Sequence, residues 1–192
     1  MYKLCKTEQS ARRQRELEQG LLAAMSTHHY EEITVSDLCD QMNIPRKSFY
    51  RYFSSKDGAL HALIDHTLLE FEGFAISDGT AVKRTYHMDL ERFFRFWKAK
   101  KGLLDALARS GISGTLVMRS IDHAVSDIGM PTRFLPQQER LAREHATKFG
   151  VCGLMSMVLN WHNNGFVLSE SQMASIAVEL LTKPLFAESD KK

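Results

Sequence analysis

The chain has 192 residues, enough for one large domain or two small ones. Its formal net charge is only +2, so a surface that attracts a charged polymer has to be a local patch. Its three cysteines form no CxxC pair, which argues against a disulfide framework and a zinc site and favours a reducing compartment.

Two further features bear on the compartment. The first residues, MYKLCKTEQSARRQRE, lack the apolar core of a secretory signal. The longest apolar run, residues 149–159, is shorter than the roughly 20 residues that span a bilayer. We therefore expect a cytoplasmic protein without a membrane partner.

Apolar residues recur at helical spacing along almost the whole chain, and no segment alternates as a strand does. We therefore predict an all-α fold with about nine helices. The first helix is expected over residues 7–27. The second begins at Thr34, whose hydroxyl can cap it, and Asp37 completes a capping box three residues later.

The second helix should end at Asn43, a residue type that tolerates the left-handed conformation. Pro45 then stands where a helix can start, because its missing N–H needs no partner there. The third helix is expected over residues 46–52, with Phe49 and Phe53 facing inward. Two short helices joined by a tight turn are typical of a helix-turn-helix.

The fourth expected helix carries a regular apolar stripe from Leu60 to Phe71, and a glycine-containing break follows at residues 73–81. The later patterns predict helices over residues 86–97, 103–110, 112–128 and 137–162, and a last one from Ser169 that ends before Pro184.

The turn-linked helix pair carries a local excess of positive charge. Between residues 41 and 56 the sequence contains Arg46, Lys47, Arg51 and Lys56 and no acidic residue. Such cations neutralise phosphates and give affinity for nucleic acid of any sequence. The alternative is a solvated basic face on an ordinary helical bundle.

Side chains at the start of a recognition helix reach base edges in the major groove. We therefore assign base contacts to Arg46, Lys47 and Ser48. Hydroxyls and ammonium groups at helix ends suit phosphates. The residues assigned to the DNA backbone on this ground are Thr34, Ser36, Tyr50 and Lys56.

The stretches ITVSDLCDQMNI and SFYRYFSSKDGAL make the first third of the chain resemble the DNA-binding domain of the tetracycline-repressor family, TetR/AcrR. In that family the third helix ends in Tyr-x-x-Phe, a Lys opens the fourth helix and a Leu follows. Those places are filled here by Tyr50, Phe53, Lys56 and Leu60.

Three residues depart from the family's pattern. His29 and Asn43 stand where glycine is usual, and we expect both to adopt the left-handed backbone, in which His and Asn are enriched. Pro45 stands where a serine often caps the third helix, so that cap and one phosphate contact are expected to be missing.

The resemblance implies a three-helix helix-turn-helix domain over residues 1–66 and a helical effector-binding and dimerisation domain over residues 67–192. It also implies a homodimer that binds double-stranded DNA at a two-fold operator, without enzymatic activity and without a cofactor.

Apolar and polar side chains on the later helices suggest two further sites. The predicted dimer interface is Phe149, Cys152, Met155, Leu159, Ile176 and Leu180, unless these helices lie in the core of one chain. The predicted effector site is Tyr86, Phe93, Phe94, Trp97, Met118, His123, Asn160 and Trp161, unless these residues simply fill the core.

We therefore predict a transcriptional regulator, a repressor that a bound effector releases from DNA. The alternative is a helical adaptor or co-activator whose C-terminal domain binds a partner protein instead of a small molecule. The sequence has no GxSxG, HExxH or glycine-rich phosphate loop, and its histidines are too dispersed to suggest a metal site.

Overall fold

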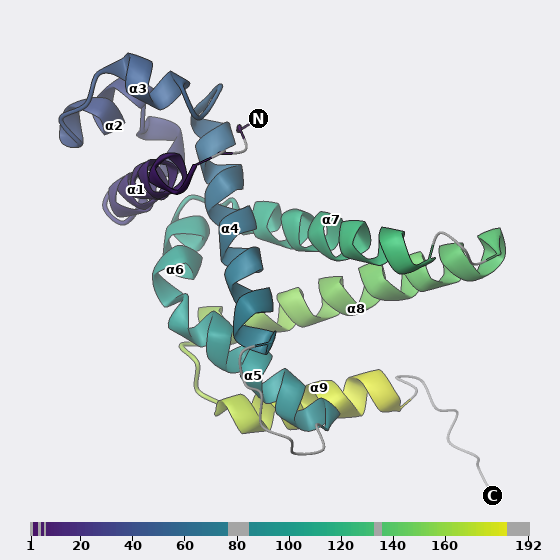
Figure 1. The fold of residues 1–192 in the computed structure, drawn as a ribbon. Coiled ribbons are helices and arrows are strands. Elements are labelled where there is room, and N and C mark those ends of the chain that lie inside the picture. Colours follow the sequence, from purple (N-terminus) through teal and green to yellow (C-terminus); the bar gives the residue numbers. More distant parts are fainter. Residues whose placement is uncertain (1, 4, 6, 77–84, 133–135, 184–192) are drawn as a thin grey trace, which may run out of the picture.

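The computed structural model describes residues 2–3, 5, 7–76, 85–132 and 136–183, and within these ranges the chain is all-α with nine α-helices (Figure 1). The prediction of the fold class is therefore confirmed. In chain order the helices are α1 (Glu8–Met25), α2 (Val35–Gln41), α3 (Arg46–Tyr50), α4 (Lys56–Ile76), α5 (Tyr86–Ala99), α6 (Lys101–Arg109), α7 (Ser113–Thr132), α8 (Gln137–Asn163) and α9 (Glu170–Thr182). A 3-10 turn, η1 (Tyr30–Glu32), precedes α2.

The N-terminal domain packs α1, α2 and α3 against the first turns of α4 (Figure 1). Its core is formed by Leu17 and Leu21 of α1, with Phe49 and Phe53 from the other side, all at most 1% exposed. The inward direction predicted for the two phenylalanines is confirmed. Burial of each such side chain contributes roughly 1.5–3 kcal/mol.

Helix α4 belongs to both halves of the molecule. It leaves the N-terminal domain and continues without a break between α5 and α7 (Figure 1). The predicted domain boundary after residue 66 lies inside this helix. Because α4 crosses this boundary as one continuous helix, the division of the chain into two domains at residue 66 stays a prediction.

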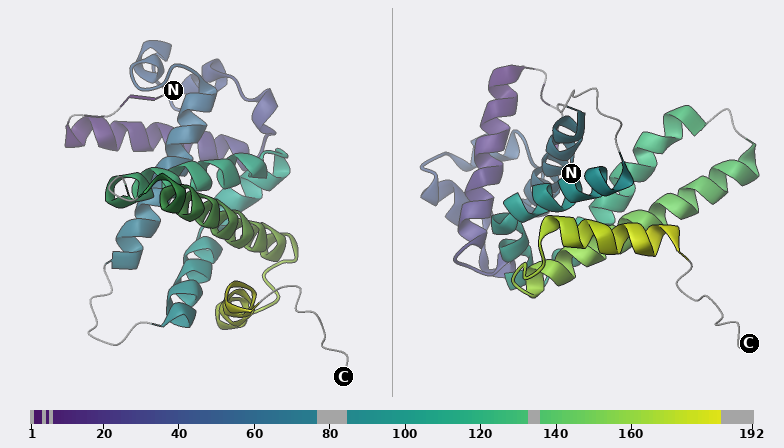
Figure 2. Two further views of the ribbon diagram at one scale, coloured as in Figure 1. Left: turned by 90° about the vertical axis from the view of Figure 1, so that its right-hand side faces the viewer. Right: turned by 90° about the horizontal axis from the view of Figure 1, so that it is seen from below.

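The C-terminal part consists of two helix pairs and the short helix α6 around the lower half of α4. Helices α7 and α8 lie side by side and project from the body, and α9 lies along α5 (Figure 2). Phe94 and Trp161 meet edge to face in the core, with ring centroids 5.7 Å apart. Of the described helices, none is both long and apolar enough to cross a membrane.

Polar contacts fasten the N-terminal part to the rest of the molecule. The Tyr2 hydroxyl donates to Asp65 Oδ2 at 2.7 Å, and Arg119 of α7 donates Nε–H to Asp65 Oδ1 at 2.8 Å and a second N–H to Oδ2. Burial, helped by the hydrogen bond to Asp65, raises the pKa of Tyr2 to about 12. The Tyr30 N–H donates to Ser110 Oγ at the end of α6, at 2.9 Å. Helices α4 and α7 are thus joined by a two-pronged ion pair.

Candidate nucleic-acid interface and ligand cavity

The capping box predicted at the start of α2 is confirmed. The Asp37 N–H donates to Thr34 Oγ1 at 3.2 Å, and the Thr34 N–H donates to Asp37 Oδ2 at 3.0 Å. The Thr34 hydroxyl also donates to Asp37 Oδ2, at 2.6 Å. These bonds from Thr34 lower the pKa of the Asp37 carboxyl below its usual value. The Thr34 hydroxyl therefore already has a partner inside the chain.

The turn between α2 and α3 depends on one left-handed residue. Asn43 has φ of 51°, as predicted, and turns the chain so that α3 can cross α2. The same expectation for His29 is wrong, because its φ is −67°. His29 is the extended residue that precedes η1, and its N–H donates to Glu32 Oε2 at 3.1 Å, so no left-handed turn is required.

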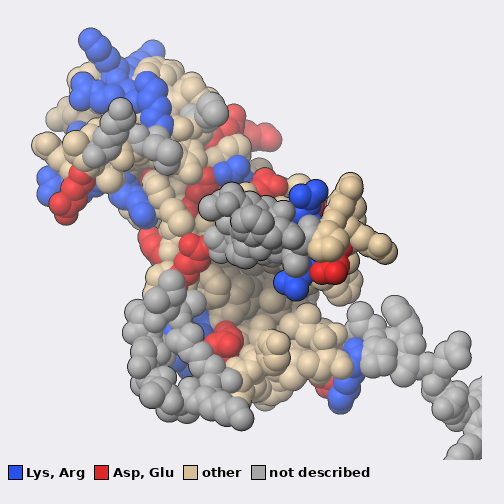
Figure 3. All heavy atoms as spheres, turned by 45° about the vertical axis from the view of Figure 1, so that its right-hand side comes forward, with Lys and Arg blue, Asp and Glu red and all other residues tan. Residues whose placement is uncertain are grey.

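Helix α3 presents its basic side chains to solvent. It begins after Pro45, which gives no side-chain cap, and ends two residues earlier than predicted. Arg46, Lys47 and Arg51 are exposed, and Tyr50 is 51% exposed. Figure 3 shows Lys and Arg side chains gathered over this end of the molecule. Ser36 and Ser48 are half-buried at the same helix pair.

Lys56 is held within the chain. Its ammonium donates to the Ile33 carbonyl at 2.7 Å and to the Tyr30 carbonyl, and it lies 4.1 Å from the centroid of the Tyr30 ring. The Tyr30 hydroxyl in turn donates to Asp57 Oδ1 at 2.6 Å. Lys56 therefore fastens the segment before α2 to the first turn of α4. Its predicted contact with a phosphate stays a prediction.

Replacing Lys56 by methionine should lower the stability of the folded protein. The change keeps the apolar stem but leaves two carbonyls without their charged donor, at a cost of about 2 kcal/mol. For a chain of this size the melting temperature should fall by about 4–8 °C, measured by circular dichroism. Lys47→Met, on the exposed face of α3, is the control and should change it little. Equal melting temperatures for the two variants would show that the Lys56 contacts add no stability.

A polar hollow next to α3 was missed by the sequence reasoning. Arg51 meets Arg12 and Arg13 of α1 there, around a space of about 420 Å³. Both arginines of α1 face Glu16: Arg13 donates to it at 2.7 Å, and the Nε of Arg12, whose side chain is 76% exposed, lies 4.0 Å from its Oε1. The sequence feature that could have indicated this hollow is the ARRQR stretch of α1, but the distance of this stretch from α3 cannot be read from the sequence.

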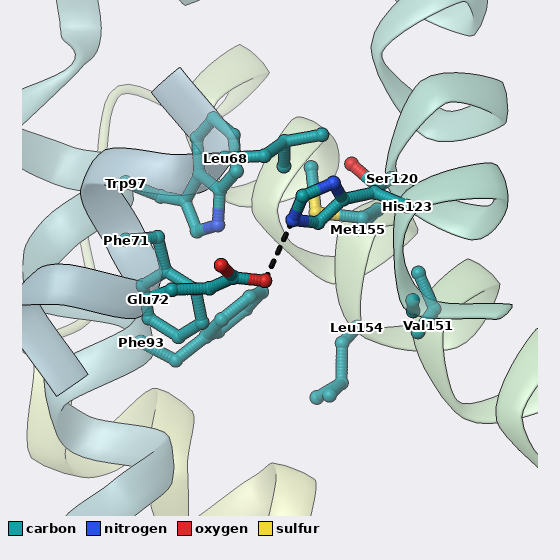
Figure 4. A pocket seen from close by; sticks show the side chains of 11 residues that line it. Leu68, Phe71, Glu72, Phe93, Trp97, Ser120, His123, Val151, Leu154 and Met155 are labelled. Carbon is teal, nitrogen blue, oxygen red and sulfur yellow. Dashed lines mark hydrogen bonds and ion pairs between the residues drawn. The ribbon is translucent and has the colours of Figure 1, made fainter. Parts of the chain in front are cut away.

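An apolar cavity of about 370 Å³ lies between α4, α5, α7 and α8 (Figure 4). Three of the residues predicted for the effector site line it: Phe93, Trp97 and His123. The α4 wall, which the sequence reasoning missed, is formed by Leu68, Phe71 and Glu72. The His123 Nε2 and Glu72 Oε1 atoms are 2.7 Å apart, so the cavity contains an imidazole–carboxylate pair.

The other five residues predicted for the effector site do not line this cavity. Phe94 and Trp161 are buried in the core, where the Trp161 N–H donates to the Leu168 carbonyl at 3.0 Å. Tyr86 and Met118 are 81% and 59% exposed, and Asn160 is exposed as well. They lie on faces of their helices that turn away from the cavity, a difference that helical spacing alone does not resolve.

The predicted dimer residues lie mostly on an exposed apolar face of α8 and α9. Phe149 is 70% exposed, and Ile176 and Leu180 are each 41% exposed. Cys152 is exposed and Leu159 half-buried. The assignment of Met155 is wrong, because this side chain is 2% exposed and lines the cavity. Residues Phe149, Leu154, Met157, Ala177, Leu180 and Leu181 also border a shallow groove between the two helices; we call this exposed region the α8–α9 face.

The fold and the basic helix pair define a helix-turn-helix DNA-binding protein with a helical C-terminal part. Residues 21–63 match the family model described as bacterial regulatory proteins of the tetR family. The match identifies a TetR-family DNA-binding domain in the N-terminal part of the chain and supports a transcriptional regulator of that family; such regulators are non-enzymatic proteins that bind DNA and generally dimerise.

Solved structures share the fold at low sequence identity. The fatty acid degradation regulator FadR from Bacillus halodurans has a TM-score of 0.56 and 14% identity, over 95% of this chain and 98% of that one. The dihydroxyacetone kinase operon activator DhaS has a TM-score of 0.52 and 16% identity, over 88% of this chain and 93% of that one. The repressor AlkX from Dietzia sp. strain DQ12-45-1b has a TM-score of 0.52 and 13% identity, over 88% of this chain and 92% of that one. No curated protein matches the chain in sequence.

Proposed function

We propose that this chain is a cytoplasmic, homodimeric repressor that binds a two-fold operator and releases it when a small molecule occupies the cavity. The observation that carries the proposal is the course of α4. One end of this helix carries Lys56, which fastens η1 and α2, and the other end carries Glu72 in the cavity wall. A change at the cavity can therefore be passed to the recognition helix through one rigid element.

The coupling rests on how α4 and α7 are held together. Two polar contacts join these helices, the ion pair of Asp65 with Arg119 and the imidazole–carboxylate pair of His123 with Glu72. A ligand in the cavity, beside the Glu72–His123 pair, would separate the helices there, while Asp65 and Arg119 serve as the pivot. A ligand that binds the separated arrangement better shifts the population toward it and away from the DNA-binding form.

The DNA contacts are divided between bases and phosphates in this proposal. Arg46, Lys47 and Ser48 read base edges, because they open the recognition helix. The phosphates are bound by the four residues that the sequence assigns to the DNA backbone, which are Thr34, Ser36, Tyr50 and Lys56. Two arginines of the polar hollow, Arg12 and Arg51, bind phosphates as well.

Arg46→Ala and Arg51→Ala should separate the two kinds of contact. Arg46→Ala should weaken the best operator about 10–100-fold and relax the base preference at one position. Arg51→Ala should weaken binding to all DNA sequences about equally. It should also lower the slope of log affinity against log salt concentration by about one. The measurement is fluorescence anisotropy on an operator selected from random DNA, with the exposed Arg140→Ala of α8 as control. A change of base preference in Arg51→Ala would contradict its assignment to a phosphate.

A two-fold operator requires two recognition helices, so we assign the dimer contact to the α8–α9 face. A contiguous exposed apolar surface on two neighbouring helices suits a four-helix arrangement with the same face of a second copy. Gly150 and Gly153 favour close approach of the two α8 helices, because nothing lies within 4 Å of a side chain added at either position.

The test of the whole proposal is operator release. Saturating the cavity with a molecule that binds it should weaken binding to the selected operator at least tenfold. Unchanged operator affinity at saturation would refute the repressor-release model.

The second candidate function is the adaptor or co-activator, and it is favoured by the fold that the chain shares with DhaS, an operon activator. It predicts that one partner protein co-purifies with the chain whether or not small molecules are present. It also predicts that the cavity residues can be replaced without effect on regulation.

A further inference from the structure

The indole N–H of Trp97 is a buried donor without an acceptor. Trp97 is 1% exposed, and its Nε1 atom has no hydrogen-bond partner among the described residues. More than nine in ten buried polar groups in proteins are paired, and an unpaired one costs about 1–3 kcal/mol. The other tryptophan, Trp161, follows the rule by donating to the Leu168 carbonyl.

The unpaired donor belongs to the cavity wall. Trp97 lines the cavity, and Figure 4 shows its indole nitrogen on the ring edge that faces the Glu72 carboxylate. Glu72 does not accept this proton in the structure, and its Oε1 atom is paired with His123 Nε2 at 2.7 Å. An oxygen atom of a bound molecule would supply the missing acceptor.

The charges of the cavity wall restrict the ligand further. Of the described residues that line it, only Glu72 and His123 have an ionisable side chain, and they already neutralise each other when both are charged. An anionic ligand would face the Glu72 carboxylate in an apolar, poorly screened space. A cationic ligand would have to compete with His123 for that carboxylate.

We propose that the cavity binds an uncharged, mostly apolar molecule with one carbonyl or hydroxyl oxygen, and that this oxygen accepts the Trp97 N–H. The volume of about 370 Å³ lies within the range of ligand pockets. Phe71, Phe93 and Leu154 surround the apolar part of the molecule. This inference rests on the proposed effector role only for its biological meaning, since it concerns what the cavity binds.

The test is a matched series of ten-carbon probes: n-decanol, decan-2-one, decane, decanoate and decyltrimethylammonium. Their affinities for the full chain are measured by calorimetry below the concentrations at which they form micelles. In parallel, nitrogen-15 spectra of the two indole N–H groups report the hydrogen bond directly, with Trp161 as the internal control. Trp97→Phe assigns the two signals.

We expect decanol and decanone to bind at least tenfold more tightly than the two charged probes and to move the Trp97 indole proton downfield. Trp97→Phe should weaken decanol about tenfold and leave decane unchanged, as loss of one hydrogen bond predicts. An unmoved Trp97 signal with bound decanol, tighter binding of a charged probe, or no saturable binding of any probe would overturn the proposal. Binding of decanol without release of the operator would leave the ligand class intact and refute the effector role instead.

Discussion

Gly150→Arg should convert the proposed dimer into a monomer and weaken operator binding about 100-fold, because a single recognition helix loses the advantage of a linked second half-site. The arginine has room in the isolated chain, since no atom lies within 4 Å of an added side chain. It also removes a glycine from a helix interior, which favours the folded chain. In the dimer, however, the new side chain would lie between the two α8 helices. Light scattering should then give the mass of one chain, 21.9 kDa.

Gly102→Arg is the matched control for this change. Gly102 is also a helical, exposed glycine with nothing within 4 Å of an added side chain, but it lies on α6, away from the α8–α9 face. It should leave both mass and operator affinity unchanged. If the Gly150→Arg protein remains a dimer, the α8–α9 face is not the dimer interface. The assignment of the DNA-binding residues would not be affected.

Asp65→Leu should lower the free energy of unfolding by about 2 kcal/mol, because it leaves the Arg119 guanidinium unpaired at a site where it is only 29% exposed. The melting temperature should fall by about 4–8 °C at a fixed protein concentration. Tyr2 loses its acceptor in the same variant, which adds to the effect.

The double variant Asp65→Leu with Arg119→Met separates the ion pair from the rest of the environment. Removing both charges should restore part of the lost stability, giving a coupling of at least about 1 kcal/mol. Simple addition of the two single effects would mean that other contacts, rather than this pair, hold α4 to α7. The pivot of the proposed release mechanism would then have to lie elsewhere.

The parts of the interface that depend on neighbours in sequence could be predicted. The cap formed by Thr34 and Asp37 and the left-handed Asn43 need residues only a few positions apart. The inward position of Phe49 and Phe53 follows in the same way from the period of a short helix. Local chemistry therefore determines these parts of the helix-turn-helix.

The cavity could not be predicted to the same extent, because its walls come from four helices. Apolar residues surround α8 over residues 149–159, so the pattern does not distinguish Met155, which lines the cavity, from the exposed Phe149. Glu72 looks like a solvated charge in the sequence, and its pairing with His123 depends on how α7 crosses α4. Lys56 is a similar case, since its two carbonyl partners are more than twenty residues away.

The continuity of α4 also limits how such a regulator can be recombined with its relatives. A chimera joined at residue 66 would cut one helix in the middle and would place Asp65 and Glu72 in sequences from different parents. A chimera joined after Ile76 keeps the helix whole. It transfers Leu68, Phe71 and Glu72 of the cavity wall together with the N-terminal domain. Under the proposed function, part of the specificity for the ligand would therefore be inherited with the specificity for DNA, and the two functions would not be independent modules of this chain.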